Sequence, residues 1–373
     1  MKILAINAGS SSVRLHAYDF PNGAPQSLWS CRLAASDQDL RKVLEEILAR
    51  QAATTFDAAV HRLVHGGSKI LHVSAVTEEI KSTIEALVPL APLHNSACLA
   101  WLEAAESVLG PKTQQMVIPD TGFFADLPER AWRYAIPADL AQRLGIRRFG
   151  FHGLAHDSMM RTWHTLSAPA ERKDAKVISI QLGSGCSMTA ALGTKPMDTS
   201  MGYTPLEGLV MATRGGDVDA GILLRLLEEG FDPESLRTQL NRESGLLGLS
   251  GLSGDMQELL DSSTDEASRA IDIYCYRARK YLGSYTAALE GIDAILFGGG
   301  VGENSPAIRA RILEGMSWCG IEIDEHRNQS LASGTRKISR DEDRVAVWVI
   351  EVDEERLMAE AVHMLLKHDL DGS

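Results

Sequence analysis

ILAINAGSSSVRLHAY, residues 3–18, is an apolar run that enters a turn of small and hydroxyl-bearing residues and leaves as a second strand-like run. Glycine lets a backbone approach a ligand closely, and backbone N–H groups together with serine hydroxyls satisfy phosphate oxygens. The turn is therefore either an ordinary Gly/Ser hairpin turn or a loop that binds phosphate. The rest of the chain decides between these two interpretations.

The second half of the chain repeats this arrangement. VISIQLGSGCSMTA (177–190) is again an apolar strand, a Gly/Ser turn and an outgoing strand. In each half a further apolar strand then runs into consecutive glycines, in AAVHRLVHGG (58–67) and in DAILFGGG (293–300). The repeated order predicts a duplicated domain, with two phosphate-type loops that face each other across a cleft. The alternative is chance similarity between β-turns.

Length, composition and charge exclude several classes of protein. At 373 residues the chain exceeds one typical hydrophobic core, so we expect two domains. A net charge of −13 disfavours nucleic acid or an anionic membrane as a partner. An anionic substrate must then be bound by local arginines.

The five cysteines are odd in number and widely spaced, which favours free thiols in a reducing cytosol. The run Lys2–Ile6 is too short for a signal peptide, and no apolar run approaches the roughly 18 residues of a membrane span. We therefore expect a cytoplasmic protein without a membrane partner.

Strand signals alternate with helical periodicity, which is typical of an α/β protein. The spacing of apolar residues predicts a helix over 37–52 with Asp37 as its N-cap, and a long helix over 264–290. A final helix is predicted after Asp353.

Polar residues concentrate in short motifs, none of which is a P-loop or a properly placed dinucleotide fingerprint. The motifs are HRLVHGG (61–67), APLHN (91–95), PDTGFF (119–124), RRFGFHG (147–153), MDTSMGYTPLEGLVMATRGGD (197–217), FGGGVGEN (297–304) and VDEE (352–355). The fifth lacks regular periodicity, and its charged residues are Asp198, Glu207, Arg214 and Asp217.

In this order, from Asn7 to Glu355, the motifs resemble those of the acetate kinase family, short-chain carboxylate kinases of the sugar kinase–actin–Hsp70 superfamily. The stretch TSMGYTPLEGL (199–209) is close to unique to that family. The resemblance implies an α/β fold of two duplicated RNase H-like (actin-like ATPase) domains flanking a nucleotide and substrate cleft. The implied domains are residues 1–150 with a returning C-terminal helix at 356–373, and residues 151–355 for the nucleotide. A homodimer is implied as well.

The implied activity is reversible transfer of the ATP γ-phosphoryl group to acetate, giving acetyl phosphate and ADP, with Mg²⁺ or Mn²⁺ as cofactor. Phosphoryl transfer requires positioning and charge stabilisation more than covalent chemistry. Arginines suit both tasks because their fixed fork of donors matches carboxylate and phosphate oxygens.

Matching the motifs position by position assigns roles to individual residues. The implied catalytic residues are Arg62, Asp120, His152 and Arg214. The implied substrate-binding residues are Arg62, Val64, Leu93, His94, Phe151 and Pro205. The implied nucleotide-binding residues are Ser10, Ser12, Arg14, Gln181, Gly183, Ser184, Gly185, Asp255, Met256, Gln257, Gly300, Val301, Gly302, Glu303 and Asn304. The implied metal-side residues are Asn7 and Glu354.

Asp120 matches a residue usually described as a proton acceptor. Small carboxylic acids titrate at about pH 4, however, so the nucleophile is already ionised at neutral pH and a general base has little to remove. We expect Asp120 instead to hold Mg²⁺, directly or through water, or to orient an arginine.

The sequence departs from the family on the phosphate and nucleotide side. The changed positions are Arg14 for lysine, Gln181 and Ser184 for the histidine and asparagine of HLGNG, Ser96 for the proline of APLHNP, and Gln257 for arginine. These changes leave open another nucleotide or pyrophosphate as phosphoryl donor. Propionate or another short acid is an alternative acceptor, because a methylene in an apolar pocket is worth only about 1–3 kcal/mol. A nucleotide-binding regulator without turnover would instead show changes at the transfer residues.

Overall fold

The computed structural model of the chain describes residues 1–9, 12–34, 39–51, 55–167, 174–330 and 333–371. The chain divides into two compact units. Unit 1 consists of residues 1–125, 151–154 and 353–373, and unit 2 of residues 126–150 and 155–352. The domain limits expected from the sequence stay a prediction; the compact units differ from them in where residues 126–150, 151–154 and 353–355 lie.

Unit 1 consists of strands that alternate with helices, as the sequence pattern indicated. Its strands are β1 (Lys2–Ala8), β2 (Ser12–Asp19), β3 (Gln26–Ala34), β4 (Ala58–Leu63), β5 (Ser74–Ala75) and β6 (Gln114–Pro119). Its helices are α1 (Leu40–Ala49), α2 (Glu78–Leu87), η1 (Val88–Leu90), α3 (Pro92–Leu109), η2 (Asp120–Phe124) and α15 (Glu354–Asp371).

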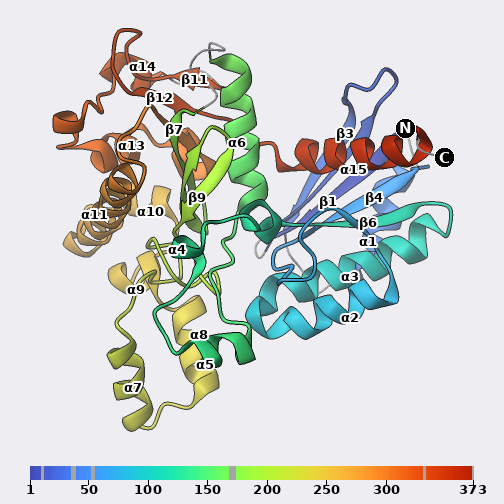
Figure 1. Ribbon diagram of the computed structural model, residues 1–373, viewed down its shortest axis with the longest axis horizontal. Helices are drawn as coiled ribbons and strands as arrows, with labels where there is room; N and C mark the ends of the chain where they lie inside the picture. The colour runs from blue at the N-terminus through green and yellow to red at the C-terminus, as the bar shows by residue number, and fades with distance from the viewer. Residues whose placement is uncertain (10–11, 35–38, 52–54, 168–173, 331–332, 372–373) are drawn as a thin grey trace. The chain divides into compact units, whose positions relative to one another are not determined.

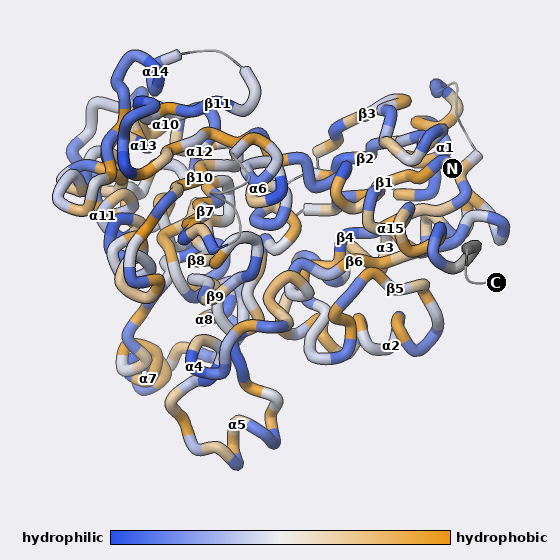
Figure 2. The backbone as a smooth tube through the Cα atoms, turned by 45° about the horizontal axis from the view of Figure 1, so that its top comes forward, coloured by the Kyte–Doolittle hydropathy of each residue, from blue (hydrophilic) through white to orange (hydrophobic). Residues whose placement is uncertain are grey.

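The described strands of unit 1 form a six-stranded sheet in the order β3-β2-β1-β4-β6-β5. β1 pairs antiparallel with β2 and parallel with β4, and β4 pairs parallel with β6. Both faces of β1 are buried: Ile3 packs in a cluster with Met358 of α15, and Leu4 in a cluster with Leu44 of α1 and Trp101 of α3. Because its side chains alternate between two covered faces, β1 is apolar almost throughout its length (Figure 2).

Unit 2 is larger and carries more helices around its sheet (Figure 1). Its strands are β7 (Lys176–Leu182), β8 (Cys186–Leu192), β9 (Lys195–Thr199), β10 (Ala294–Gly298), β11 (Arg336–Lys337) and β12 (Ala346–Val349). Its helices are α4 (Glu129–Trp132), α5 (Ala138–Leu144), α6 (Gly153–Leu166, whose first two residues belong to unit 1), α7 (Ala220–Glu228), α8 (Pro233–Arg242), α9 (Gly245–Ser250), α10 (Met256–Asp261), α11 (Asp265–Ala288), α12 (Gly299–Asn304), α13 (Pro306–Leu313), η4 (Ser317–Cys319) and α14 (Glu325–Gln329).

The sheet of unit 2 repeats the topology of the first sheet. Within the part of the chain that the structure describes, its order is β11-β12-β10-β7-β8-β9. β7 pairs antiparallel with β8 and parallel with β10, and β10 pairs parallel with β12, as their counterparts do in unit 1. The prediction of a duplicated RNase H-like fold is therefore confirmed, and each Gly/Ser turn joins the first two strands of its sheet.

The predicted helices are present, with one change at a helix start. α11 begins after Thr264, which caps it by accepting from the backbone N–H of Ala267, and α15 begins directly after Asp353. α1 is shorter than predicted, and its N-cap is Asp39, which accepts from Arg41 N and Lys42 N. The predicted cap, Asp37, lies outside the described residues. No helix in the described ranges is long and apolar enough to cross a membrane.

Candidate active site

In unit 1, Arg62 and Asp120 meet at the carboxyl ends of two neighbouring parallel strands. Arg62 lies near the end of β4, and Asp120 follows the end of β6 directly. The guanidinium binds the carboxylate in a bidentate manner, with Nε 3.1 Å from Oδ1 and Nη2 2.6 Å from Oδ2. Asp120 is fully buried. Burial raises the pKa of Asp120, but the two-point contact with Arg62 opposes this and favours the ionised carboxylate.

Arg62 also contacts two further residues of unit 1. Its Nη1 donates to Asn7 Oδ1 at 3.2 Å and to Glu354 Oε2 at 3.3 Å. Burial by itself would lower the pKa of Arg62, but Asp120 and Glu354 outweigh this and raise it above its usual range. Arg62 is thus a permanently charged guanidinium whose position is fixed by two carboxylates.

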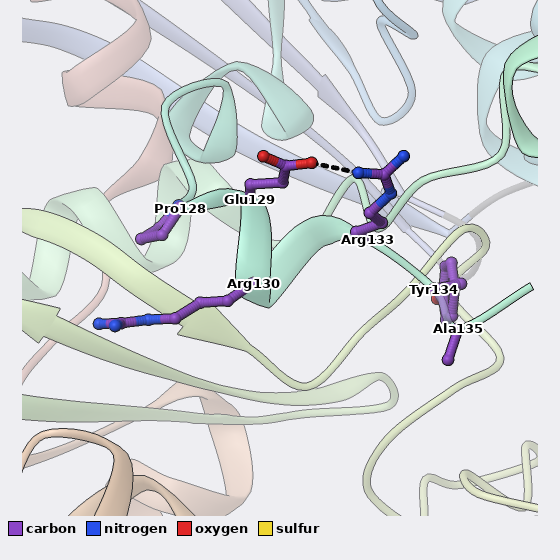
Figure 3. A pocket seen from close by; sticks show the side chains of 6 residues that line it. All are labelled: Pro128, Glu129, Arg130, Arg133, Tyr134 and Ala135. Carbon is purple, nitrogen blue, oxygen red and sulfur yellow. Dashed lines mark hydrogen bonds and ion pairs between the residues drawn. The ribbon is translucent and has the colours of Figure 1, made fainter. Parts of the chain in front are cut away.

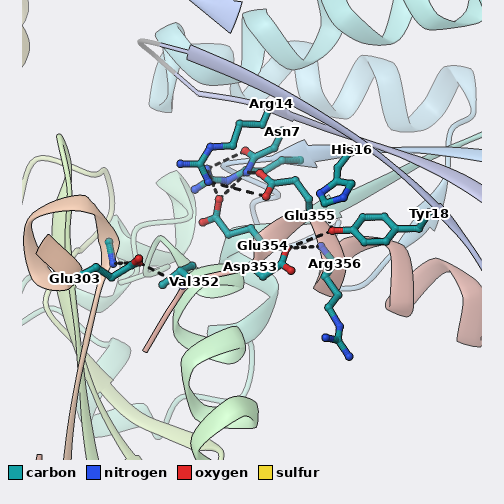
Figure 4. A network of polar contacts seen from close by, with 12 residues as sticks. Asn7, Arg14, His16, Tyr18, Glu303, Val352, Asp353, Glu354, Glu355 and Arg356 are labelled. Carbon is teal, nitrogen blue, oxygen red and sulfur yellow. Dashed lines mark hydrogen bonds and ion pairs between the residues drawn. The ribbon is translucent and has the colours of Figure 1, made fainter. Parts of the chain in front are cut away.

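Two adjacent carboxylates, Glu354 and Glu355, lie buried at the start of α15 (Figure 4). The side-chain amide of Asn7 bridges them, because Nδ2 donates to Glu354 Oε2 and to Glu355 Oε1, both at 2.6 Å. Arg14, which lies opposite Asn7 in the β1–β2 register, approaches Glu355 to 3.9 Å. Burial and the neighbouring Glu354 raise the pKa of Glu355. Glu355 was not assigned a role from the sequence, although the VDEE motif places two acids at a helix start.

A second group of contacts holds the first turn of α15 on the sheet (Figure 4). Asp353 caps the helix by accepting from Arg356 N at 3.0 Å, and it also accepts from the hydroxyl of Tyr18 at 3.4 Å. Tyr18 is hydrogen-bonded to His16, which in turn contacts Ser27 on β3. The position of Glu354 and Glu355 is therefore tied to β2 and β3.

His152 has an unusual backbone conformation next to Asp120. Its φ is +57°, in the left-handed region that only a few non-glycine residues adopt. Its backbone N–H donates to Asp120. A Cβ on the following Gly153 would lie 1.9 Å from the carbonyl oxygen of Asp120, so only glycine fits there. The GFHG motif therefore brings the backbone of residues 152–153 against the Asp120 turn.

The loop after β4 is held by residues from two other motifs. His65 N donates to Asn95 Oδ1, Asn95 Nδ2 donates back to His65 O, and Gly66 N donates to Thr121 Oγ1. All three contacts are buried. Asn95 and Thr121, which were not assigned from the sequence, explain why APLHN and PDTGFF accompany HRLVHGG.

The predicted residues of the substrate pocket fall in both units. Val64 and Phe151 are buried in unit 1, where Phe151 contacts the ring of His65 edge-to-face at 5.3 Å. His94 lies in the first turn of α3 and is half-buried, and Leu93 belongs to the same helix. Pro205 belongs to unit 2 and is buried. A shared methyl pocket stays a prediction.

Each unit has a narrow turn at the predicted phosphate position. In unit 1, Gly9 N donates to Ser12 O at 2.9 Å, and Ser10 lies outside the described residues. In unit 2, Gly183 N donates to Gly185 O at 3.1 Å between β7 and β8. The carbonyl of Ser184 accepts from Ala212 N at 3.0 Å, which brings this turn to the segment that carries Arg214.

Arg214 contrasts with Arg62. Its Nη1 donates to the carbonyl oxygen of Pro205 at 2.8 Å, and no carboxylate among the described residues forms an ion pair with it. Burial lowers its pKa. A partly buried guanidinium is costly without a counter-charge, so this site favours an anion.

The predicted nucleotide residues of unit 2 lie around the same turn. β10 pairs with β7 and leads into α12 (Gly299–Asn304), which holds Gly300, Val301, Gly302, Glu303 and Asn304. A Cβ on Gly299 would lie 2.6 Å from the carbonyl oxygen of Leu182, so α12 packs closely on the end of β7. Glu303 Oε1 accepts from Gly299 N and from Val352 N (Figure 4).

Two further predicted residues occupy structural positions in unit 2. Asp255 caps α10 by accepting from the backbone N–H groups of Gln257 and Glu258, and Met256 is buried. The side chain of Gln257 donates to Asp261 at 3.0 Å. The side-chain amide oxygen Oε1 of Gln181 is buried without a hydrogen-bond partner, which leaves an acceptor beside the phosphate-type turn.

The comparisons with known proteins agree over nearly the whole chain. A sequence profile described as the acetokinase family matches residues 22–360. The acetate kinase of Chloroherpeton thalassium is 43% identical over 335 residues, which cover 87% of this chain and 80% of that protein. The crystal structure of Porphyromonas gingivalis acetate kinase superimposes with a TM-score of 0.86 at 34% identity, covering 98% of this chain and 99% of that one. A propionate kinase from Francisella tularensis superimposes with a TM-score of 0.85 at 30% identity, covering 96% and 98%.

The duplicated actin-like fold, together with these relatives, defines a phosphotransferase that acts on a carboxyl group. The chain belongs to the acetokinase family.

Proposed function

We propose that this protein transfers the γ-phosphoryl group of ATP reversibly to acetate, giving acetyl phosphate and ADP. The observation that carries the proposal is Arg214, a partly buried guanidinium without a carboxylate partner among the described residues, next to the Gly183–Gly185 turn. Such a group stabilises an anionic ligand, and a glycine turn admits phosphate oxygens.

Arg62 and Arg214 would divide the work of charge stabilisation. Asp120 and Glu354 hold the guanidinium of Arg62 in place, so any N–H group left for a ligand would point in a fixed direction. Arg214 would bind the transferring phosphoryl group or the acetate carboxylate, and His152 would donate a hydrogen bond to a phosphoryl oxygen. The bidentate contact supports Asp120 as the residue that orients Arg62 rather than as a general base.

The acidic cluster of unit 1 fits magnesium. The cluster contains three buried carboxylates, those of Asp120, Glu354 and Glu355. Its positive charges are those of Arg62 and the half-exposed Arg14, so negative charge is in excess. Mg²⁺ prefers such hard oxygen ligands. Mg²⁺ usually keeps several waters and takes few protein ligands, so water and the nucleotide phosphates would complete its coordination. We propose Glu354 and Asn7 as its protein side. Bound Mg²⁺ would neutralise charge that develops on the phosphates.

Glu354→Gln tests the metal assignment. Glutamine keeps the size of the side chain but removes its charge, so we expect half-maximal activity to require about ten-fold more Mg²⁺ than in the wild type, at unchanged KM for acetate. Glu351→Gln is the matched control, because Glu351 is exposed and lies outside the cluster. An unchanged Mg²⁺ requirement in Glu354→Gln would remove this residue from the metal site.

The activity itself is tested by trapping acyl phosphate as the hydroxamate. Acetate, propionate and butyrate are each combined with ATP, GTP and pyrophosphate in the presence of Mg²⁺. We expect the highest kcat/KM with acetate and ATP. Folded protein that yields no hydroxamate with any pair would refute the proposal.

The same matrix decides between the proposal and its alternatives. The likeness to a propionate kinase favours propionate as the second candidate acceptor. The departures from the family motifs lie mainly on the side that would bind the phosphoryl donor, at Arg14, Gln181, Ser184 and Gln257. GTP or pyrophosphate would therefore be the alternative donor.

We also propose a cytoplasmic homodimer. The five cysteines are free, which suits a reducing compartment. α7 is apolar on several sides and leaves Ile222, Leu224 and Leu227 exposed, a surface that a second copy of the chain would cover. Light scattering of wild type and Leu224→Asp tests this: the wild type should have twice the chain mass, and the variant should shift toward the monomer.

A further inference from the structure

The segment of residues 200–217 carries Arg214 but forms no helix or strand. Its own backbone bonds are few; one runs from Met211 N to Arg214 O, and another joins Asp217 N to Gly208 O. Backbone N–H groups of Ser244, Leu246 and Leu247 hold residues 211–213, whereas side chains from elsewhere hold much of the rest of the segment. In unit 2 the most extensive of these contacts involve Arg148.

Arg148 uses all three of its nitrogens in buried or half-buried contacts. Its Nε donates to Ala131 O at 3.2 Å, and Nη1 donates to the carbonyl oxygens of Thr199 and Ser200, both at 3.1 Å. Its Nη2 donates to Glu207 Oε1 at 2.5 Å. One guanidinium therefore joins the end of β9 to the middle of the segment.

Tyr134 completes this arrangement on the other oxygen of Glu207. The tyrosine hydroxyl donates to Glu207 Oε2 and accepts from Tyr203 N at 2.9 Å, while its ring lies 5.5 Å from the guanidinium carbon of Arg148. Tyr134 also lines a surface pocket together with Pro128, Glu129, Arg130, Arg133 and Ala135, and Glu129 pairs with Arg133 there (Figure 3).

Gly202 packs closely against Glu207 and Tyr134. A Cβ on Gly202 would lie 1.7 Å from Glu207 Oε2 and 2.1 Å from the Tyr134 hydroxyl. The carbonyl of Gly202 accepts from Phe149 N at 3.0 Å, next to Arg148 in the chain. The close approach requires glycine, and it fixes the segment against residues 148–149.

The other carboxylate of the segment, that of Asp217, also accepts hydrogen bonds from neighbouring groups. Asp217 accepts from Gly208 N at 2.9 Å and from the hydroxyl of Tyr281 at 2.8 Å. Both acidic side chains of residues 200–217 thus have partners of their own, while Arg214 is bonded to the carbonyl of Pro205. This arrangement leaves the charge of Arg214 available to a ligand.

We propose that Arg148, Glu207 and Tyr134 are positioning residues for Arg214, and that they hold the 200–217 segment so that its guanidinium remains free for an anionic substrate. The proposal rests on the proposed function for the role of Arg214. It accounts for the two motifs, RRFGFHG and TSMGYTPLEGL, whose charged residues the transfer chemistry itself does not use.

The test compares Glu207→Gln, Glu207→Ala and Tyr134→Phe with the wild type. We expect kcat for acyl phosphate formation to fall about 10- to 100-fold in Glu207→Ala, because a small displacement of a catalytic group has an effect of this size. KM for the nucleotide should stay within about two-fold. Glu207→Gln keeps the side-chain length and one of the two acceptor oxygens, so it should retain more activity than Glu207→Ala. Arg161→Ala, which breaks an exposed ion pair with Asp157 on α6, is the control and should retain wild-type kcat.

A double variant separates positioning from general stability. If Glu207 acts through Arg214, then adding Glu207→Gln to Arg214→Ala causes no further loss of kcat. A loss by the same factor in both backgrounds overturns the proposal, as does wild-type kcat in Glu207→Ala.

Hydrogen exchange gives a readout that does not depend on turnover. In folded Tyr134→Phe and Glu207→Gln, the amides of residues 200–216 should exchange faster than in the wild type, whereas Arg161→Ala should leave them unchanged. Unchanged exchange in both variants overturns the proposal. A wild type that yields no acyl phosphate but shows this exchange pattern refutes the proposed function and leaves the positioning of the segment supported.

Discussion

At the scale of single residues, the two arginines that the sequence singled out are held in different ways. Arg62 is bound by Asp120 and Glu354, whereas Arg214 has a carbonyl oxygen as its partner. A guanidinium that is already neutralised orients a site, and one that is not neutralised binds an anion. The structure therefore gives two residues of the same type different partners, a difference that their motifs alone did not indicate and that supports the roles proposed for them.

Arg214→Ala is expected to lower kcat by about 10²–10³-fold, the usual effect of removing one donor that stabilises charge in the transition state. Nucleotide binding should persist, since α12 and the Gly183–Gly185 turn are unaffected. Steady-state hydroxamate kinetics and calorimetric titration with ADP measure the two quantities. Near-wild-type kcat would exclude Arg214 from the transfer site.

At the scale of elements, the first turn of α15 is the part of unit 1 that connects most to the site. Glu354 and Glu355 lie on this turn, and Asp353, Tyr18 and His16 attach it to the sheet. Asp353 is both the N-cap of α15 and a contact to the sheet, so the stability of this helix and the positions of Glu354 and Glu355 depend on the same residue.

Asp353→Ala removes this cap, and loss of an N-cap costs about 1 kcal/mol of stability. We expect the free energy of unfolding to fall by about that amount and kcat to fall as well, because Glu354 loses its fixed position. Asp39→Ala removes the equivalent cap of α1 and is the control, with a similar loss of stability but wild-type kcat. Urea unfolding and hydroxamate assays give both values. Equal kcat in the two variants would contradict the coupling.

At the scale of the whole molecule, each unit contains a buried histidine that bridges elements of its sheet. His61 on β4 contacts Gln115 on β6 at 2.9 Å. His156 on α6 contacts Ser179 on β7 at 2.7 Å and Ser187 on β8 at 2.8 Å. Burial lowers the pKa of His61 to about 4 and that of His156 to about 3. Both imidazoles are therefore neutral in the folded protein at physiological pH.

These histidines make the protein sensitive to acid. The unfolded chain binds their protons near pH 6.5, while the folded chain does not until about pH 4 for His61 or pH 3 for His156. Between these limits the unfolded state holds more protons, so stability falls as the pH falls, by about 1.4 kcal/mol per pH unit for each histidine. Above pH 6.5 neither group contributes to the pH dependence.

His156→Gln should reduce the slope of unfolding free energy against pH between about 4 and 6.5, measured by urea unfolding at several pH values. The raised pKa values of the buried carboxyls Asp120 and Glu355 make stability rise as the pH falls, which opposes the effect of the histidines. This contribution is the same in the wild type and in His156→Gln. The difference between the slopes of these two proteins therefore reports on His156. Equal slopes would mean that His156 is protonated in the folded state. His61→Gln repeats the test in unit 1.

The sequence by itself predicted the first two strands of each unit, a further strand that runs into consecutive glycines, and the duplication. Apolar periodicity and glycine turns are local signals, and the β1–β2 and β7–β8 hairpins appear where those signals indicated. The motifs also named candidate site residues, including Arg62, Asp120, His152 and Arg214, whose roles stay predictions. The sequence offered Asp37 as the cap of α1, which lies outside the described residues, whereas the structure shows that Asp39 caps this helix.

Only the tertiary structure decided which side chains neutralise one another. The Asn7–Glu354 contact joins residues 347 positions apart, and the Arg148–Glu207 contact joins residues 59 positions apart. No local period encodes such pairs, because they depend on how strands and loops distant in sequence meet at the ends of a sheet. Folding therefore determined that Arg62 is bound by two carboxylates, that Glu207 is bound by Arg148 and Tyr134, and that Arg214 keeps its charge for a ligand.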